Sequence, residues 1–278
     1  MLTLSIITPS YNHGRFIEQT ILSVVNQDYP KIEYLVIDGG STDETVEILR
    51  RYSSRITYWV SEPDEGHRYA LKKGFDRATG EIVAWQNADD YYEPWVFGKV
   101  MRIFHRHPEI DLVYGNIRLV DEHSREIDVL KFVPLTRSRL ALFDGLPFQN
   151  HAAFFRRRLW DAIGGIRFVD YNFDTDLIYR AARIANARFI PRILGNYRAH
   201  LGSQYFSGAY RAIEVSHDTI RQRYLGSWKR LPRWTYPVLS AAARARRFGY
   251  YVIQGDWDYL LRRVTRRLER KRSPFLRL

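Results

Sequence analysis

Two adjacent carboxylates, Asp89 and Asp90, lie just beyond the end of a short apolar run. The run, Ile82–Trp85, is typical of a buried strand, and the polar residues Gln86 and Asn87 follow it. Neighbouring carboxylates repel each other unless a cation lies between them. Hard oxygen ligands suit Mg²⁺ or Mn²⁺, which substrate phosphates help to hold. The pair therefore predicts a metal and phosphate site, although Asp and Asn also favour an ordinary solvated turn.

The elements that must position this pair alternate along the chain. Four apolar runs predict strands, and apolar residues at helical spacing predict three helices between them. This alternation is typical of an α/β, doubly wound, mostly parallel sheet. A polar segment follows each strand, so the four segments should meet at one edge, where such sheets bind ligands. None of them contains a dinucleotide-binding or P-loop motif. The segments are 9–14, 38–43, 61–66 and 86–90.

The formal net charge of +12 is carried by the C-terminal part of the chain. Residues 221–278 hold sixteen Lys or Arg against three Asp or Glu, a net charge of +13, which leaves residues 1–220 nearly neutral. Such asymmetry favours a tail with an anionic partner of its own. We therefore expect a catalytic-sized domain at 1–220 and a basic, helical C-terminal extension at 221–278.

The end of this extension has the pattern of a basic amphipathic helix. Its apolar residues recur at helical spacing, and arginines fill the other face. Helices of this kind are typical of the membrane interface, and each basic residue adds attraction to anionic lipids. Two alternatives remain: the helix packs on the body with its basic face exposed, or it binds nucleic acid, which the lack of a nucleic-acid module disfavours. The apolar residues are Trp257, Leu260, Leu261, Val264 and Leu268.

The composition limits the possible chemistry and the expected cellular location of the chain. The chain has no cysteine, which excludes disulfides and thiolate chemistry. Its first residues lack the pattern of a secretory signal, and no apolar run reaches the roughly 18 residues of a membrane span. We expect a cytoplasmic protein that can lie peripherally on the inner face of the cell membrane.

Five segments of the chain resemble, in order and spacing, the motifs of family 2 glycosyltransferases. The resemblance covers roughly residues 3–205 and implies a GT-A fold. It also implies metal-dependent, inverting transfer of a hexose from a UDP-, GDP- or dTDP-sugar to a glycan or lipid-linked acceptor in surface polysaccharide synthesis, with Mn²⁺ or Mg²⁺ as cofactor. The segments are Pro9–Asn12, Asn26–Pro30, Asp38–Asp43, Asp64–Gly66 and Asn87–Asp90.

The resemblance also assigns roles to single residues. Pro9 and Tyr11 would line the pocket for the base, Asp38 would hold the base, and Asp174 is similar to the catalytic base of the family. Asp90 and His200 would serve the metal. The residues expected to contact the nucleotide sugar are Pro9, Tyr11, Asn12, Asp38, Ser41, Asp64, Arg68, Lys72 and Asp89.

Several of these roles have alternatives. Asp176, and more distantly Asp170, compete with Asp174, which would also suit a helix cap. The remaining alternatives are ordinary structural roles: Asp38 as a turn former, Tyr11 as a core aromatic, His200 as a structural histidine, and Arg68 and Lys72 as solvated cations. Lys72 replaces the Asn of many relatives, which leaves the identity of the sugar open. Two further residues, Gln149 and His151, are candidates to face the acceptor.

Two other functions compete with glycosyl transfer. A sugar nucleotidyltransferase also uses a doubly wound nucleotide-binding domain, but its Gly-rich phosphate loop is missing here. A non-catalytic glycan- or membrane-binding module of the same fold would not need Asp89, Asp90 and Asp174. Formation of pyrophosphate would identify the first alternative, and absence of sugar-nucleotide hydrolysis would favour the second.

Overall fold

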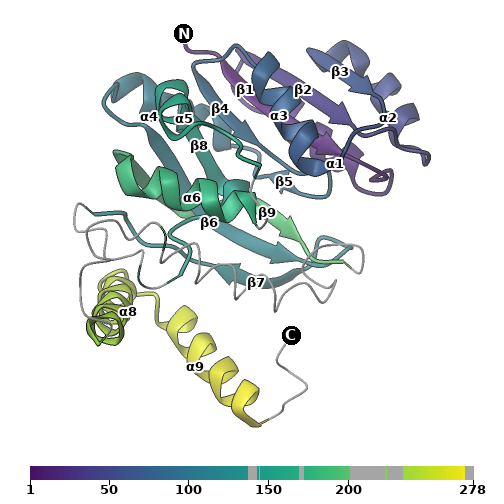
Figure 1. Cartoon of the computed structure of the whole chain (residues 1–278). Coiled ribbons are helices and arrows are strands. Elements are labelled where there is room, and N and C mark those ends of the chain that lie inside the picture. The colour runs from purple at the N-terminus through teal and green to yellow at the C-terminus, as the bar shows by residue number, and fades with distance from the viewer. Residues whose placement is uncertain (137–142, 144, 169–171, 201–222, 224–233, 273–278) are drawn as a thin grey trace.

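The first half of the protein is a parallel α/β sheet, as the sequence predicts. The structure is a computed structural model, and it describes residues 1–136, 143, 145–168, 172–200, 223 and 234–272, with the backbone alone for 266–272. Four parallel strands are connected by three helices (Figure 1). These elements are β1 (Leu4–Ser10), α1 (Ile17–Val25), β2 (Ile32–Asp38), α2 (Thr45–Arg51), β3 (Tyr58–Ser61), α3 (His67–Arg77) and β4 (Ile82–Trp85).

The second half makes the sheet mixed. The strand order is β3-β2-β1-β4-β8-β6-β9-β5, and β7 pairs with β6 outside this path. The two halves join where β8 pairs antiparallel with β4, whereas β6 and β9 are parallel. The elements are β5 (Tyr91–Tyr92), α4 (Val96–Arg106), β6 (Leu112–Val120), β7 (Glu126–Leu130), β8 (Ala153–Arg156), α5 (Arg157–Ile163), α6 (Phe173–Ile184) and β9 (Ala187–Arg198).

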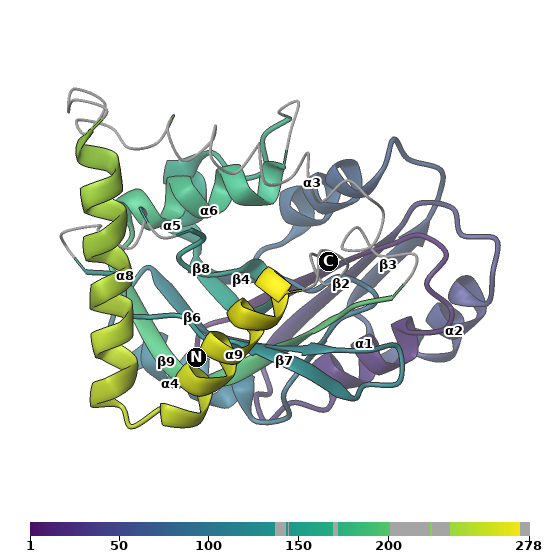
Figure 2. The same cartoon turned by 90° about the horizontal axis from the view of Figure 1, so that it is seen from below.

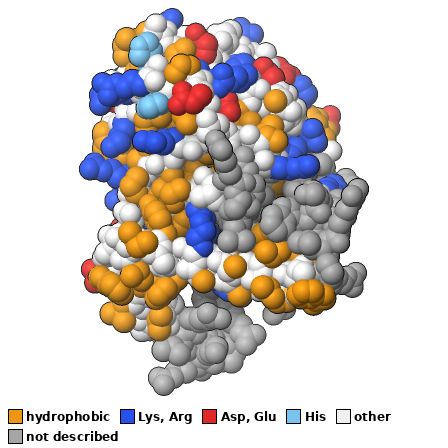
Figure 3. All heavy atoms as spheres, turned by 90° about the vertical axis from the view of Figure 1, so that its left-hand side faces the viewer, with side chains coloured by type: hydrophobic (Ala, Val, Ile, Leu, Met, Phe, Trp, Pro, Cys, Tyr) orange, Lys and Arg blue, Asp and Glu red, His pale blue; other side chains and the backbone are white. Residues whose placement is uncertain are grey.

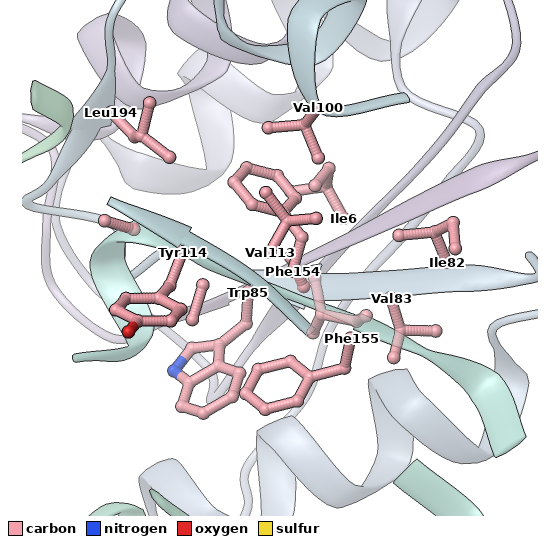
Figure 4. Packing of buried hydrophobic residues seen from close by; sticks show 14 of the residues in the cluster. Ile6, Ile82, Val83, Trp85, Val100, Val113, Tyr114, Phe154, Phe155 and Leu194 are labelled. Carbon is pink, nitrogen blue, oxygen red and sulfur yellow. The ribbon is translucent and has the colours of Figure 1, made fainter. Parts of the chain in front are cut away.

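Helices cover both faces of the sheet. Seen from below, α3, α5 and α6 lie on one side, and α1, α2 and α4 lie on the other (Figure 2). The strands between them are buried on both faces, which explains why β4 reads as an unbroken apolar run rather than an alternating one. Trp85 and Phe155 stack across the β4–β8 junction with their ring centroids 6.2 Å apart (Figure 4). The core therefore continues from the parallel half into the mixed half.

Strand β9 carries a close contact. It is twelve residues long and ends at Arg198. A side chain at Gly195 would place its Cβ 1.9 Å from the backbone oxygen of His151. Only glycine fits there, and the contact presses the turn Asn150–Ala152 against β9.

Two helices, α8 (Thr235–Ile253) and α9 (Trp257–Arg272), lie beyond β7 (Figure 1). Both lie in the part of the chain where the sequence predicts a helical extension, which stays a prediction. The expected boundary at residue 220 lies outside the described residues, so the division into two domains stays a prediction. Within the part of the chain that the structure describes, no helix combines the length and the apolar character needed to cross a bilayer.

Candidate functional site

The polar loops after β1, β2, β3 and β4 meet at one edge of the sheet, as predicted. The loops after β1 and β2 are tied by Asn12, whose N–H donates to Ser41 Oγ over 2.7 Å and whose Oδ1 accepts the N–H of Thr42 over 2.9 Å. Asn12 adopts a positive φ of 55°, a conformation that Asn tolerates better than most residues. Asn12 and Ser41, expected at the nucleotide, therefore hold the two loops together.

Asp89 is the carboxylate that faces the histidines of this edge. Its Oδ2 lies 3.1 Å from Nε2 of His200 and 4.0 Å from Nε2 of His13. Burial alone would raise the pKa of Asp89, but the hydrogen bond with His200 and the charges of both histidines lower it below its ordinary value. Asp89 is thus held as an anion beside an imidazole.

Asp90 turns the other way, into the protein. Asp90 has no exposed surface. Its Oδ1 accepts the N–H of Arg198 over 2.8 Å. Its Oδ2 lies 3.1 Å from His151 Nε2 and accepts a hydrogen bond from Asn87 Nδ2 over 3.0 Å. Burial and the charge of Asp89 raise the pKa of Asp90. Burial would lower the pKa of His151, but the nearby charge of Asp90 raises it. The two form a buried pair.

This pair bears on two expectations, which stay predictions. Asp90 was expected to bind the metal, and both its oxygens are enclosed and occupied by protein donors here. His151 was a candidate for the acceptor side, but it is buried against Asp90. The residue turned toward His200 is instead Asp89.

Arg198 locks the loop that carries both carboxylates. Its guanidinium is buried, donates to the backbone oxygens of Asp89 and Glu122 over 2.8 and 3.0 Å, and also donates to the side chain of Gln19. It lies over the ring of Phe16 at 4.8 Å. One side chain therefore ties α1, the β4–β5 loop and the β6–β7 turn to the end of β9, two residues before His200.

Asp174 reaches the same edge from α6. It is the second residue of the helix, and its Oδ1 accepts the N–H of Thr175 over 2.6 Å, so it is not the N-cap that the sequence suggested. Phe173 packs on His67 with ring centroids 5.5 Å apart, and His67 Nε2 lies 3.1 Å from Asn87 Oδ1. These contacts bring the start of α6 beside the loop of Asp89.

His67 lies near both carboxylates. Solvent reaches its ring, yet desolvation by the surrounding protein lowers its pKa, against the hydrogen bond to Asn87 and the negative charges of Asp174 and Asp89. The imidazole of His67 is therefore within electrostatic reach of Asp174 and of Asp89.

The alternatives to Asp174 fare differently. Asp176 is 1% exposed and its Oδ2 accepts Nε of Arg180 over 2.7 Å, so its carboxylate is enclosed and used. Asp170 lies outside the described residues. Of the two carboxylates at the start of α6 that the structure describes, Asp174 is the more accessible one.

A cavity of about 560 Å³ lies between β3 and α3, and its lining includes Asp38 but neither Pro9 nor Tyr11, which were expected to line the base pocket. Asp38 is fully buried, and its oxygens accept from Ser41 and Ser61, so it holds the turn after β2 together. Asp64 is exposed and also lines the cavity. Tyr11 is 58% exposed and free of the core, which leaves its ring open to a ligand.

The remaining expected residues are spread around this cavity and beyond it. Pro9 is buried in β1, next to the loop of Tyr11. Lys72 lines the cavity and pairs with Asp76 one turn along α3, while Arg68 lies 5.8 Å from the ring of Phe168. Gln149 is half-buried at the start of the turn that carries His151.

Sequence reasoning missed four residues of this site. Asn87 lies inside the segment Asn87–Asp90, in which only its neighbours were given roles, and Arg198 lies two residues before His200. His13 follows the first polar loop motif and His67 follows Asp64–Gly66, so proximity to a motif was the available signal.

The donor set suits a hard divalent ion. Within residues 1–136, 145–168 and the other described segments, no three His, Cys, Asp or Glu side chains form a metal cluster. Asp89 and His200 form a pair, and Mg²⁺ is commonly bound by one or two carboxylates together with substrate phosphates. The residues present therefore fit a metal whose remaining ligands come from a diphosphate.

The sequence matches known proteins along most of its length. Residues 5–164, more than half of the chain, match the model of glycosyl transferase family 2. An uncharacterised glycosyltransferase of Nostoc sp. is 25% identical over 92% of this chain and 85% of its own. A putative teichuronic acid biosynthesis glycosyltransferase of Bacillus subtilis, TuaG, is 39% identical over 32% of this chain and 37% of its own.

Solved structures share the fold. TarS 1–349 of S. aureus in complex with UDP-GlcNAc has a TM-score of 0.60 and 18% identity, covering 87% of this chain and 79% of that one. The mannosyltransferase PcManGT of Pyrobaculum calidifontis, in complex with GDP-Man and Mn²⁺, has a TM-score of 0.59 and 22% identity, covering 87% and 69%. The expected GT-A fold is thereby confirmed.

Proposed function

The chain belongs to glycosyl transferase family 2, and we propose from this that it transfers a sugar, with inversion, from a nucleotide-diphosphate sugar to a hydroxyl acceptor. The fold is shared with proteins whose structures hold UDP-GlcNAc and GDP-Man, which supports a donor of this class. The likeness to TuaG supports a role in surface polysaccharide or lipid-linked glycan synthesis.

One observation carries the proposal: His67 links the start of α6, which carries Asp174, to the loop that carries Asp89. The ring of His67 packs on Phe173 and reaches Asn87, so the start of α6 lies beside the acidic loop after β4. A transferase of this kind needs a base for the acceptor and a separate means of holding the departing diphosphate. We assign the first task to Asp174 and the second to Asp89.

Asp174 is the proposed catalytic base. As the acceptor oxygen attacks the anomeric carbon, Asp174 takes the hydroxyl proton, and the bond from that carbon to the diphosphate oxygen breaks with its electron pair leaving on the nucleoside diphosphate. Attack from the face opposite the leaving group inverts the anomeric configuration. Asp176 does not fit this role because its carboxylate is buried against Arg180.

Asp89 and His200 are the proposed ligands of a divalent ion, with His13 close by. Mn²⁺ or Mg²⁺ bound there would offset the negative charge that gathers on the departing diphosphate. Arg198 holds the loop of Asp89 at its backbone oxygen, so the carboxylate is aimed before the donor arrives. Asp90 supports the loop from inside rather than meeting the ion.

The donor nucleotide is proposed to enter the cavity between β3 and α3. Tyr11 offers an exposed ring for stacking. Asp64 is an exposed carboxylate of the cavity, which makes it a better partner for the base than the enclosed Asp38. Lys72 lies on the wall of the same cavity and can add positive charge near the sugar or the phosphates.

A basic helical tail that binds a membrane would bring the enzyme to an acceptor that is anchored there by a lipid. We therefore propose that the protein works at the inner surface of an anionic membrane, reached through its C-terminal helices. The enzyme would then reach a lipid-linked hydroxyl acceptor at the membrane surface.

Thermal unfolding with added nucleotides tests the proposal. We expect UDP, GDP or dTDP together with Mn²⁺ to raise the Tm, and we expect Asp89→Asn to lose the part of the shift that depends on the metal. The control is Asp161→Asn, an exposed carboxylate on α5, which should behave as the unchanged protein. Hydrolysis of the matching sugar nucleotide should follow the same pattern.

Two results would contradict the proposal. If none of the nucleotides changes the Tm with or without metal, the chain is a non-catalytic module. If sugar phosphate and nucleoside triphosphate yield pyrophosphate, the chain is a nucleotidyltransferase.

A further inference from the structure

Helix α8 is fixed to the body by one face. Ala243 and Tyr251 are 3% and 2% exposed, and Ala243 belongs to the main core. Ser240 Oγ donates to the backbone oxygen of Phe143, and Tyr251 Oη donates to that of Lys131, both over 2.7 Å. These contacts set the rotation of the helix, and its opposite face therefore points outward.

The outward face of α8 is apolar. Val238, Ala241, Ala245 and Phe248 are exposed at spacings of three and four residues, and Val238 and Phe248 are 60% and 54% exposed. Ile253, the last residue of the helix, is 82% exposed. Residues at these spacings form one stripe along a helix. Figure 3 shows hydrophobic side chains across the lower part of the side of the molecule on which α8 lies. A soluble enzyme has no need of such a stripe unless something covers it.

Helix α9 extends this surface. Trp257, Leu261 and Val264 are 60%, 68% and 54% exposed, and Arg262 and Arg263 flank them. The rings of Tyr251 and Tyr259 lie 4.9 Å apart and join α9 to α8. The sequence pattern placed the apolar face on α9, and the structure adds exposed apolar side chains on α8.

The positive charge around the stripe favours an anionic partner. Helix α8 carries three Arg and no Asp or Glu, and residues 221–278 have a net charge of +13. A second copy packed on this face would set arginine against arginine with no carboxylate on either α8 to pair with them. An anionic lipid surface accepts both the apolar stripe and the arginines at its border.

We infer that the outward face of α8, continued by Trp257, Leu261 and Val264 of α9, is the surface by which the protein docks on an anionic membrane. The inference rests on the proposed membrane association and names the face that makes it. Tryptophan is favoured at the boundary between lipid and water, where Trp257 and the 70% exposed Trp234 would lie at the two ends of the α8 stripe.

Vesicle binding by the full chain tests the inference. The double variant Phe248→Ser/Ile253→Ser should bind vesicles of phosphatidylglycerol and phosphatidylcholine at least tenfold more weakly than the unchanged protein. The matched control is Ile127→Ser/Ile184→Ser, which removes two apolar side chains that are 43% and 52% exposed on β7 and α6. The control should bind as the unchanged protein does, and neither protein should bind vesicles of phosphatidylcholine alone.

Three outcomes would overturn the inference. The α8 variant binds as tightly as the control; the unchanged protein does not bind the anionic vesicles; or light scattering shows a dimer that the α8 variant loses, which would assign the face to a second copy. The nucleotide-dependent Tm shift is measured on the same samples. A protein that keeps this shift but ignores vesicles contradicts only the docking surface, and one that binds vesicles without any shift contradicts only the proposed reaction.

Discussion

The backbone N–H of Arg198 donates to Oδ1 of Asp90 over 2.8 Å, while its own guanidinium donates to the backbone oxygen of Asp89. The end of β9 is thus bound to the acidic loop at two points. His200 follows Arg198 by two residues, so the same bonds fix the distance between His200 and Asp89. The two proposed metal ligands, from segments more than a hundred residues apart, are in this way held together by one buried arginine.

Replacing Arg198 by lysine should separate this positioning from charge. Lysine keeps the charge but cannot reproduce a planar fork that serves several backbone oxygens at once. We expect Arg198→Lys to cost about 1–3 kcal/mol of unfolding free energy, the penalty for buried acceptors left unpaired. Urea unfolding measures it.

The control for this change is Arg125, in the turn between β6 and β7 that Arg198 contacts. Arg125 pairs with Asp121 at the surface, and Arg125→Lys should alter the unfolding free energy by well under 1 kcal/mol. Equal stability of the two variants would show that the buried fork of Arg198 is not needed.

Asp174→Asn should remove the base and leave the donor site intact. The amide keeps the size of the side chain but cannot accept the acceptor proton, so we expect the transfer rate to fall by about 10²–10⁴-fold. The Tm shift with nucleoside diphosphate and Mn²⁺ should persist, because Asp174 takes no part in donor binding. Steady-state transfer and thermal unfolding on one preparation measure both.

Asp176→Asn serves as the comparison because it tests the rival residue. Asp176 is buried against Arg180, so its loss should lower stability by about 3–5 kcal/mol. The rate per folded molecule should stay close to that of the unchanged protein. A variant at Asp174 that keeps its rate, with one at Asp176 that loses it, would reverse the assignment.

The acid side of the stability curve should depend on Glu33. Burial alone would raise its pKa, but hydrogen bonds from Ser5 and Thr79 lower the pKa of Glu33 below 4.5. Because the folded-state pKa is the lower one, this stabilisation is complete above about pH 4.5 and is lost as the pH falls through the folded value.

Thermal unfolding between pH 3 and pH 7 checks this dependence. Glu33→Gln should lower the Tm at pH 7 by about 2–4 °C, the effect of roughly 1 kcal/mol in a domain of about this size. The difference between the two proteins should shrink toward pH 3. A difference that stays constant across the range would mean that the charge of Glu33 contributes nothing.

The parallel half was predictable because local signals determine it. Each strand from β1 to β4 is a short apolar run followed by a polar loop, and sheets of this kind gather those loops at one edge. The gathering of Tyr11, Asp38, Asp64 and Asp89 at that edge follows from the order of elements alone. The family resemblance added Asp174 from beyond this region.

The opposite orientations of Asp89, which faces His200, and Asp90, which is buried, were not predictable. Adjacent side chains in a loop can point to opposite sides, and the backbone of that loop is set by Arg198, from the far end of the chain. The same holds for His151, which reaches Asp90 only because β8 inserts between β4 and β6. Contacts of this range have no local pattern in a sequence. Helix α8 escaped notice for another reason, since its alanines are neutral until the structure shows which face is covered.

The insertion of β8 beside β4 also has a consequence for biosynthesis. Strand β8 follows β4 by about seventy residues, so a nascent chain leaving the ribosome exposes the open edge of β4 until that later segment arrives. Unpaired edges of apolar strands invite association with other chains. The interval between translating the two strands is therefore the period in which the edge of β4 is open to association with other chains.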